Sequence, residues 1–341
     1  MPIQIDQARA RDLAPQLDDA LKIVCNEFDG LDAHRGYHNA FARALKPDPL
    51  GRVLMLGTDQ RDLFVPLLRR TVAEQVPAGG QIFDIGAGDG QTFGYIADAV
   101  PAGTMVSIAE PNPAYLAAYQ GFLERQPNLR GGAAALAGLD DLDDLDEFDE
   151  QATGTLGDLP EPDSIDVALG LHMIYFATDV ARSLRSILRF LKPGGVYFNV
   201  VTDETTAYSG AVLRSFIESV GDTDDNDRYF AAMDERRRLL APEAEGGGGL
   251  AQAVGAAGIE VEVDAVRQES RMYGNSLADL LALANISVLT DHAGTGKFES
   301  AAMTLRDRPE EVDLRIETEG PRMGMWSVVQ PQWVTRVRRV L

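Results

Sequence analysis

Residues 81–90 read Gln81-Ile82-Phe83-Asp84-Ile85-Gly86-Ala87-Gly88-Asp89-Gly90. The apolar residues at the start of this stretch predict a short buried strand, and residues 91–100, with apolar side chains on one side, predict a helix. Three alternating glycines connect the two, because glycine takes positive φ angles without penalty and lets a ligand lie against bare backbone. The N-terminus of the helix offers unpaired N–H groups and a positive dipole end, which suit a carboxylate or a phosphate. The stretch therefore predicts a ligand site at a strand–turn–helix junction.

The spacing of the glycines separates this loop from a dinucleotide-binding loop. The dinucleotide fingerprint is Gly-x-Gly-x-x-Gly, whereas here Gln91 occupies the position of its third glycine. An acidic residue, Asp84, also lies within the strand just before the first glycine. A nucleoside ligand without a pyrophosphate would fit so closed a loop. A nicotinamide or flavin enzyme remains the alternative.

A second acidic residue follows the next predicted strand. Residues 104–109 predict that strand, and Glu110 comes directly after it, twenty residues beyond Gly90. A carboxylate at the tip of the adjacent strand is placed to accept both hydroxyls of a ribose. The alternative is a solvent-exposed glutamate at a strand end. The loop and the delayed acid together predict a nucleoside site.

Residues 165–201 predict the second half of the same core. Residues 165–171 form a buried-strand pattern, residues 179–191 an amphipathic helix, and residues 196–201 another strand. Leu191-Lys192-Pro193-Gly194-Gly195 contains the glycine and proline residues that end a helix. Strands alternating with helices predict an α/β fold with a doubly wound, Rossmann-like parallel sheet.

The glycine loop and the Leu-Lys-Pro-Gly-Gly turn resemble motifs of the class I S-adenosylmethionine-dependent methyltransferases. The resemblance implies S-adenosylmethionine as the cofactor. The loop and its acidic residue would hold the methionine end, the delayed glutamate the ribose, and Asp140 or Asp141 the adenine amino group. The implied cofactor-binding residues are Asp84, Gly86, Gly88, Gly90, Glu110, Asp140 and Leu171.

Residues 110–116 and 171–179 are locally similar to histamine N-methyltransferase and its bacterial relatives. In that group a glutamine near the transferred methyl takes the position of His172, and aromatic residues take the positions of Tyr175 and Phe176. The similarity implies catalytic roles for His172 and Tyr175 and a substrate contact for Phe176. His172 could accept a proton from an amine, and a structural polar residue at the strand end is the alternative. Histidine in place of glutamine leaves the amine substrate open.

The chain is expected to have three consecutive parts. Residues 1–78 predict a helical N-terminal lid or substrate cap, residues 79–205 the cofactor-binding core, and residues 206–341 the rest of the sheet. The last part should carry a helical, substrate-binding insertion before a final strand near residues 325–329. Three residues of the lid are candidate substrate contacts, of which the acidic one matches an amine-binding residue of the histamine N-methyltransferase group: Tyr37, His38 and Asp59.

Composition limits the partners. The net charge of −22 disfavours nucleic acid, because the arginine clusters at 236–238 and 336–339 are short and are interpreted as solvated faces. An apolar run of membrane-spanning length and a leader-like N-terminus are both lacking, which predicts no membrane contact and a cytoplasmic protein. The single cysteine excludes a zinc site with several thiolates, and His34 and His38 lack a third ligand, so no metal is expected.

These features predict a methyltransferase for a small polar amine- or amino-acid-like metabolite, with N-methylation favoured. Methyl transfer requires little beyond placing the nucleophile in line with an activated carbon in a dry pocket. Methylation at sulfur, oxygen or carbon is one alternative. A non-catalytic S-adenosylmethionine-binding protein is another. The sequence leaves the acceptor and the oligomeric state open.

Overall fold

The computed structural model describes residues 2–44, 46–143, 159–221, 224–287 and 295–340. The chain packs into two compact units, each assembled from three stretches. Unit 1 comprises Met1–Leu63, Thr202–Tyr229 and Gln268–Gln332. Unit 2 comprises Phe64–Val201, Phe230–Arg267 and Trp333–Leu341. Among the described residues, no helix combines the length and the apolar character needed to cross a membrane.

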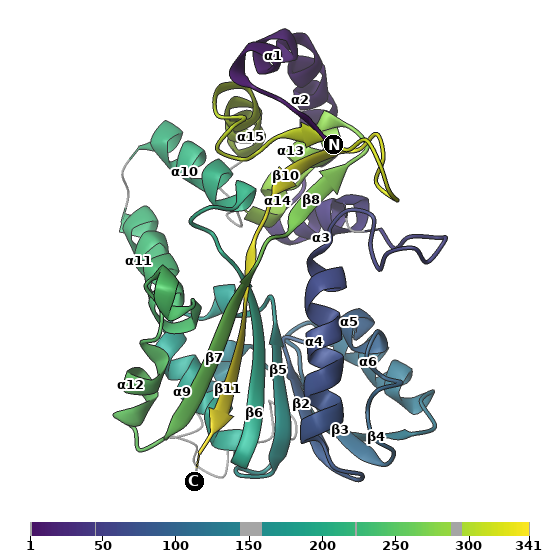
Figure 1. Cartoon of the computed structure of the whole chain (residues 1–341), viewed down its shortest axis with the longest axis vertical. Coiled ribbons are helices and arrows are strands. Elements are labelled where there is room, and N and C mark those ends of the chain that lie inside the picture. Colours follow the sequence, from purple (N-terminus) through teal and green to yellow (C-terminus); the bar gives the residue numbers. More distant parts are fainter. Residues whose placement is uncertain (1, 45, 144–158, 222–223, 288–294, 341) are drawn as a thin grey trace. The chain divides into compact units, whose positions relative to one another are not determined.

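Unit 2 is built on a seven-stranded sheet with the strand order β4-β3-β2-β5-β6-β11-β7 (Figure 1). The strands are β2 (Gln81–Ile85), β3 (Thr104–Ala109), β4 (Leu129–Ala135), β5 (Ile165–Leu171), β6 (Leu191–Thr202), β7 (Val261–Gln268) and β11 (Gln332–Arg339). Strands β4, β3, β2, β5 and β6, which are neighbours in that order, pair in parallel. Because the order reverses between β2 and β5, ligands are expected at the carboxyl ends of these two strands.

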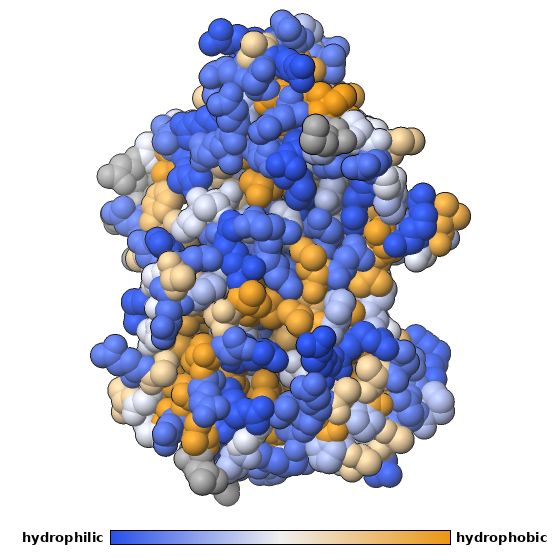
Figure 2. Space-filling view, in the orientation of Figure 1, coloured by the Kyte–Doolittle hydropathy of each residue, from blue (hydrophilic) through white to orange (hydrophobic). Residues whose placement is uncertain are grey.

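The last two strands of this sheet run antiparallel. Val340 N–H donates to the carbonyl of Glu260 at 2.8 Å, and Arg336 pairs with Asp264, so residue numbers rise along β11 as they fall along β7. Exposure alternates along β7, whose residues are half-buried or exposed in turn. Figure 2 shows hydrophobic and hydrophilic residues intermingled over these strands. One face of β7 and of the C-terminal half of β11 is therefore exposed to solvent.

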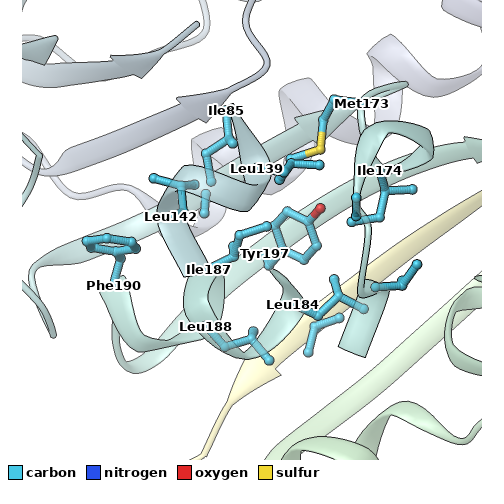
Figure 3. Close-up of a cluster of buried hydrophobic side chains, with 14 of the residues drawn as sticks. Ile85, Leu139, Leu142, Met173, Ile174, Leu184, Ile187, Leu188, Phe190 and Tyr197 are labelled. Carbon is cyan, nitrogen blue, oxygen red and sulfur yellow. The ribbon is translucent and has the colours of Figure 1, made fainter. Parts of the chain in front are cut away.

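Helices flank the sheet of unit 2. They are α4 (Gln60–Gln75), α5 (Gln91–Gly94), α6 (Pro113–Glu124), α7 (Leu139–Asp143), α9 (Val180–Phe190), α11 (Asp224–Leu240) and α12 (Leu250–Gly255), with the short 3₁₀ turns η2 (Ile174–Phe176) and η3 (Glu243–Glu245). On one face α9 contacts α7 and α12. Figure 3 shows the resulting core, where Leu184 and Ile187 of α9 lie against Tyr197 of β6. The predicted α/β fold with a Rossmann-like sheet is confirmed.

Unit 1 has its own sheet and core. Its strands, in the antiparallel order β1-β9-β10-β8, are β1 (Ile3–Gln4), β9 (Arg315–Ile316), β10 (Trp326–Val329) and β8 (Arg271–Gly274). Its helices are α1 (Gln7–Asp12), α2 (Ala14–Phe28), α3 (Ala33–Ala44), α10 (Tyr208–Val220), α13 (Leu277–Ala282), α14 (Ala284–Ser287) and α15 (Gly296–Asp307). The rings of Phe28 in α2 and Phe298 in α15 meet at 5.5 Å. The N-terminal helices thus share one core with helices from the end of the chain, and their role as a lid remains a prediction.

Two strand predictions need correction. The strand predicted last, near residues 325–329, is β10 and belongs to the sheet of unit 1, whereas β11 is the last strand and completes the main sheet. In β11, exposed Arg336 and Arg338 alternate with buried Val337, which is the period of a strand with one wet face. The turn residues 191–195 are part of β6, whose pairing with β5 is irregular there and includes Gly194 at a φ of 83°.

Candidate cofactor and active site

The glycine loop joins β2 to α5 at the carboxyl edge of the sheet. Gly86, Gly88 and Gly90 have φ angles of 63°, 59° and 80°, all in the left-handed region that favours glycine. A Cβ at Gly86 would lie 2.6 Å from that of Met173, and one at Gly90 would lie 2.5 Å from the Tyr119 ring. At Gly88 no described atom lies within 4 Å of that position. Packing thus forbids side chains at two of these glycines, while the backbone of Gly88 lies open to a ligand.

Asp84 lies at the base of this loop and is 4% exposed. One of its carboxylate oxygens, Oδ2, accepts a hydrogen bond from the Tyr119 hydroxyl at 2.8 Å. Burial raises the pKa of Asp84 to about 7, the hydrogen bond from Tyr119 opposes this rise, and the negative charge of Glu110 adds to it. Asp84 therefore changes charge near neutral pH.

Glu110 connects the end of β3 to the glycine loop. Its Oε2 accepts from the Gly88 N–H at 2.8 Å and its Oε1 from the Asn112 N–H at 2.9 Å, and the side chain is 6% exposed. A carboxylate offers about four lone-pair sites. These two hydrogen bonds fix its orientation and leave lone pairs that could accept ribose hydroxyls.

Asp140 lies in the first turn of α7. Its Oδ1 accepts from the backbone N–H of Thr178 at 3.0 Å, and its Oδ2 from the hydroxyl of the same residue at 2.5 Å. The neighbouring Asp141 accepts from the Gly138 N–H at 2.7 Å. Asp140 therefore ties α7 to the segment after β5, and its contact with adenine remains a prediction.

The residues after β5 bring two predicted catalytic side chains together. His172 follows the half-buried Leu171 and has a φ of 58°, unusual for a residue with a side chain. Its N–H donates to the carbonyl of Val200 at 2.8 Å, and its Nδ1 lies 3.3 Å from the Tyr175 hydroxyl. The two rings are nearly parallel, at 10°. Strained backbone of this kind clusters at functional sites.

Two phenylalanines and an arginine surround His172 and Tyr175. Phe64 of α4 meets the ring of His172 edge-on at 6.0 Å. Tyr175 is half-buried, whereas the ring of Phe176 is 57% exposed. The sequence pattern missed Arg236, which was interpreted as a solvated residue but is 2% exposed, with its guanidinium 5.7 Å from the centre of the Tyr175 ring.

A signal for Arg236 exists in the sequence. It precedes the buried Leu239 and Leu240 by three and four residues, so it shares their face of α11. The same kind of signal applies to Tyr119, which lies on the apolar face of α6 with Leu123. A buried tyrosine hydroxyl needs a hydrogen-bond partner, and here that partner is the Asp84 carboxylate of β2.

The predicted substrate contacts Tyr37, His38 and Asp59 lie in unit 1. The rings of Tyr37 and His38 meet edge-on at 5.5 Å. Asp59 accepts from the Arg271 N–H at 2.7 Å and from the Tyr273 hydroxyl at 2.8 Å, and its pKa is raised by burial against these hydrogen bonds. Their contact with a substrate remains a prediction. The side chain of His34 lies outside the described part of the chain.

Residues 83–199, from β2 to β6, match a family model described as a methyltransferase domain. The chain carries a methyltransferase domain. The match confirms the predicted class of enzyme, an S-adenosylmethionine-dependent methyltransferase. Membership of the histamine N-methyltransferase-like group is left as a prediction. The matched residues of this methyltransferase include the glycine loop, Glu110, Asp140 and the segment from Leu171 to Phe176.

Solved structures resemble the methyltransferase at low identity. The YcgJ protein of Bacillus subtilis is 14% identical with a TM-score of 0.47, over 81% of this chain and 98% of that chain. A putative methyltransferase of Bacillus halodurans is 12% identical with a TM-score of 0.46, over 82% and 100%. A putative sarcosine dimethylglycine methyltransferase of Galdieria sulphuraria is 10% identical with a TM-score of 0.45, over 90% and 98%. No curated protein matches the sequence.

Proposed function

We propose that this methyltransferase binds S-adenosylmethionine at the carboxyl ends of β2 and β3 and methylates a small polar metabolite with amine or amino-acid character, at nitrogen. The observation that carries the proposal is the pairing of an open glycine with a buried acid. The N–H of Gly88 holds Glu110 at 2.8 Å, and the space above Gly88 is clear of described atoms to 4 Å. A nucleoside needs that combination, because its ribose requires a fixed acceptor and its approach requires bare backbone.

Each cofactor residue has a distinct task in this proposal. The open backbone of the loop at Gly88 would lie against the methionine moiety, and the buried Asp84 would supply negative charge for its ammonium group. Glu110 would accept the ribose hydroxyls, and Asp140 would contact the adenine. The bound cofactor supplies a methyl carbon activated by a sulfonium. The protein then has to place the acceptor and exclude water.

His172 and Tyr175 are the proposed catalytic residues. An ammonium acceptor must lose a proton before its nitrogen can attack, and imidazole is the side chain suited to take a proton near neutral pH. The Tyr175 hydroxyl, 3.3 Å from Nδ1 of His172, would hold the imidazole in place. The exposed face of Phe176 would favour a cationic acceptor by about 0.5–2 kcal/mol, whereas the Tyr175 ring already faces the guanidinium of Arg236.

A screen for S-adenosylhomocysteine release over amines, amino acids and thioethers tests the proposal. We expect turnover of an amine by the wild type and a loss of about 10²–10⁴-fold in His172→Ala, the usual contribution of general base catalysis. A thioether needs no base, so near-full activity of His172→Ala on a thioether would identify methylation at sulfur instead. Tight cofactor binding without product from any acceptor would contradict the catalytic proposal and favour a cofactor-binding protein.

A further inference from the structure

Tyr119 of α6 is completely buried beneath the glycine loop, at 0% exposure. Its ring packs against those of Phe93 and Phe122, with centroids 5.7 and 6.1 Å away. The ring also fills the space that a side chain at Gly90 would need, since a Cβ there would lie 2.5 Å from it. The last glycine of the loop therefore rests directly on this tyrosine.

The hydroxyl of Tyr119 reaches the acid of β2. It donates to Oδ2 of Asp84 at 2.8 Å, within a fully buried environment. A buried carboxylate tends to take up a proton because its charge is poorly solvated. The groups that act on Asp84 from the elements around it are Tyr119 on α6 and Glu110 at the end of β3. Glu110 favours the protonated form, so among these described groups the Tyr119 hydroxyl is what favours the ionised one.

The same helix also anchors the second acid. Asn112 caps α6 by accepting from the Ala114 N–H at 2.9 Å, and its own N–H donates to Oε1 of Glu110 at 2.9 Å. One helix thus supports the methionine-end acid through Tyr119 and the ribose acid through its cap. A change in α6 would move both.

We propose that Tyr119 is a positioning residue for the cofactor: its hydroxyl orients the Asp84 carboxylate under the glycine loop and favours its ionised form, and so sets the lower pH limit of cofactor binding. This inference rests on the proposed binding of S-adenosylmethionine at the loop. It assigns to α6 a function beyond packing on the sheet. It also predicts that cofactor affinity falls as pH drops through about 7, because Asp84 then gains a proton.

Tyr119→Phe tests the proposal, because it removes the hydroxyl and keeps the ring under Gly90. Tyr197→Phe is the matched control, since Tyr197 is equally buried in unit 2 and its hydroxyl bonds Asn199 at 3.0 Å. The first measurement is the ¹³C NMR titration of the Asp84 carboxyl in the ligand-free protein, assigned with Asp84→Asn. We expect a midpoint near 7 in the wild type and in Tyr197→Phe. In Tyr119→Phe it should be about one pH unit higher, the effect of one lost hydrogen bond to a charge.

The second measurement is calorimetry of S-adenosylmethionine binding at pH 6, 7 and 8. If binding needs ionised Asp84, Tyr119→Phe should bind about tenfold more weakly at pH 6 and only about twofold more weakly at pH 8. A merely structural role would lower affinity by the same factor at every pH, and that result would overturn the proposal, as would an unchanged carboxyl midpoint. If Tyr119→Phe does not fold, the pH dependence of binding by the wild type and by Asp84→Asn decides. The affinity of the wild type must fall below pH 7, and the affinity of Asp84→Asn must not. Absence of binding by the wild type would refute the proposed function, while the carboxyl titration would still report on the Tyr119–Asp84 link.

Discussion

Asp84→Asn should stabilise the protein at neutral and alkaline pH while weakening its hold on the cofactor. Asp84 is 4% exposed and its pKa is raised to about 7, mainly by burial. Asparagine resembles the protonated acid in size and can still accept from the Tyr119 hydroxyl, but it carries no charge to bury. The substitution therefore removes the free-energy cost of burying the charge of Asp84. We attribute that cost to the role of the charge in cofactor binding.

The magnitude follows from the proton balance between the folded and unfolded chains. An unfolded aspartate has a pKa of about 3.9, so from pH 4 to 7 the unfolded chain has released a proton that the folded chain retains. The wild type consequently loses stability as pH rises through that window, and the loss levels off above about 7. A gap of about three pKa units corresponds to about 4 kcal/mol in total, and to about 3 kcal/mol between pH 5 and pH 8.

Urea denaturation of wild type and variant at pH 5, 6, 7 and 8 measures this difference. The free energy of unfolding of Asp84→Asn, relative to wild type, should grow by about 3 kcal/mol from pH 5 to pH 8. Asp166→Asn is the control: Asp166 is also buried but accepts from the Lys192 ammonium at 2.9 Å and the Gln81 N–H at 2.7 Å, so its loss should destabilise. Parallel pH curves for wild type and Asp84→Asn would show that the buried charge costs nothing and refute the reasoning.

Three further substitutions have distinct expected outcomes. Gly90→Ala should lose about 2–4 kcal/mol of unfolding free energy in urea, because it adds a Cβ 2.5 Å from the Tyr119 ring at a φ of 80°. Gly88→Ala shares the positive φ but meets open space, so it should lower the free energy of unfolding by only about 1–2 kcal/mol. Relative to that loss of stability, its loss of cofactor affinity should be larger than that of Gly90→Ala. His172→Gly should raise the free energy of unfolding by about 1 kcal/mol, because glycine adopts a φ of 58° without strain. The variant should lose most of its activity on an amine, and unchanged activity would exclude His172 as the base.

The cofactor core could be predicted because its signals are local. The glycines at 86, 88 and 90 have the positive φ angles that their residue type favours, and strand β5 begins and ends at the expected residues. From β2 to β6 each strand is followed by a helix, so hydrophobic periodicity and turn residues predict the alternation, although the helix expected over 91–100 is limited to α5 at Gln91–Gly94. The predicted Glu110 lies next to the loop for the same reason, since neighbouring parallel strands align their carboxyl ends.

The remaining features depend on partners that are distant in sequence. β10 and β11 are separated by two residues, yet they belong to different sheets, and nothing within either strand states which partner it will pair with. Arg236 is buried against Tyr175, sixty-one residues earlier, although its run of arginines has the composition of a solvated face. Tyr119 was recognisable as a buried residue of α6, but its bond to Asp84 requires the packed helix and strand together.

The most direct test of the central claim is calorimetric titration of S-adenosylmethionine into the wild type, Glu110→Ala and the control Glu74→Ala, which alters an exposed glutamate of α4. The account predicts saturable binding at one cofactor per chain in the wild type and in Glu74→Ala. In Glu110→Ala, the loss of two hydrogen bonds between the carboxylate and a ribose should weaken binding by about 10²-fold or more. No heat from the wild type, or equal affinity of Glu110→Ala and wild type, would contradict it.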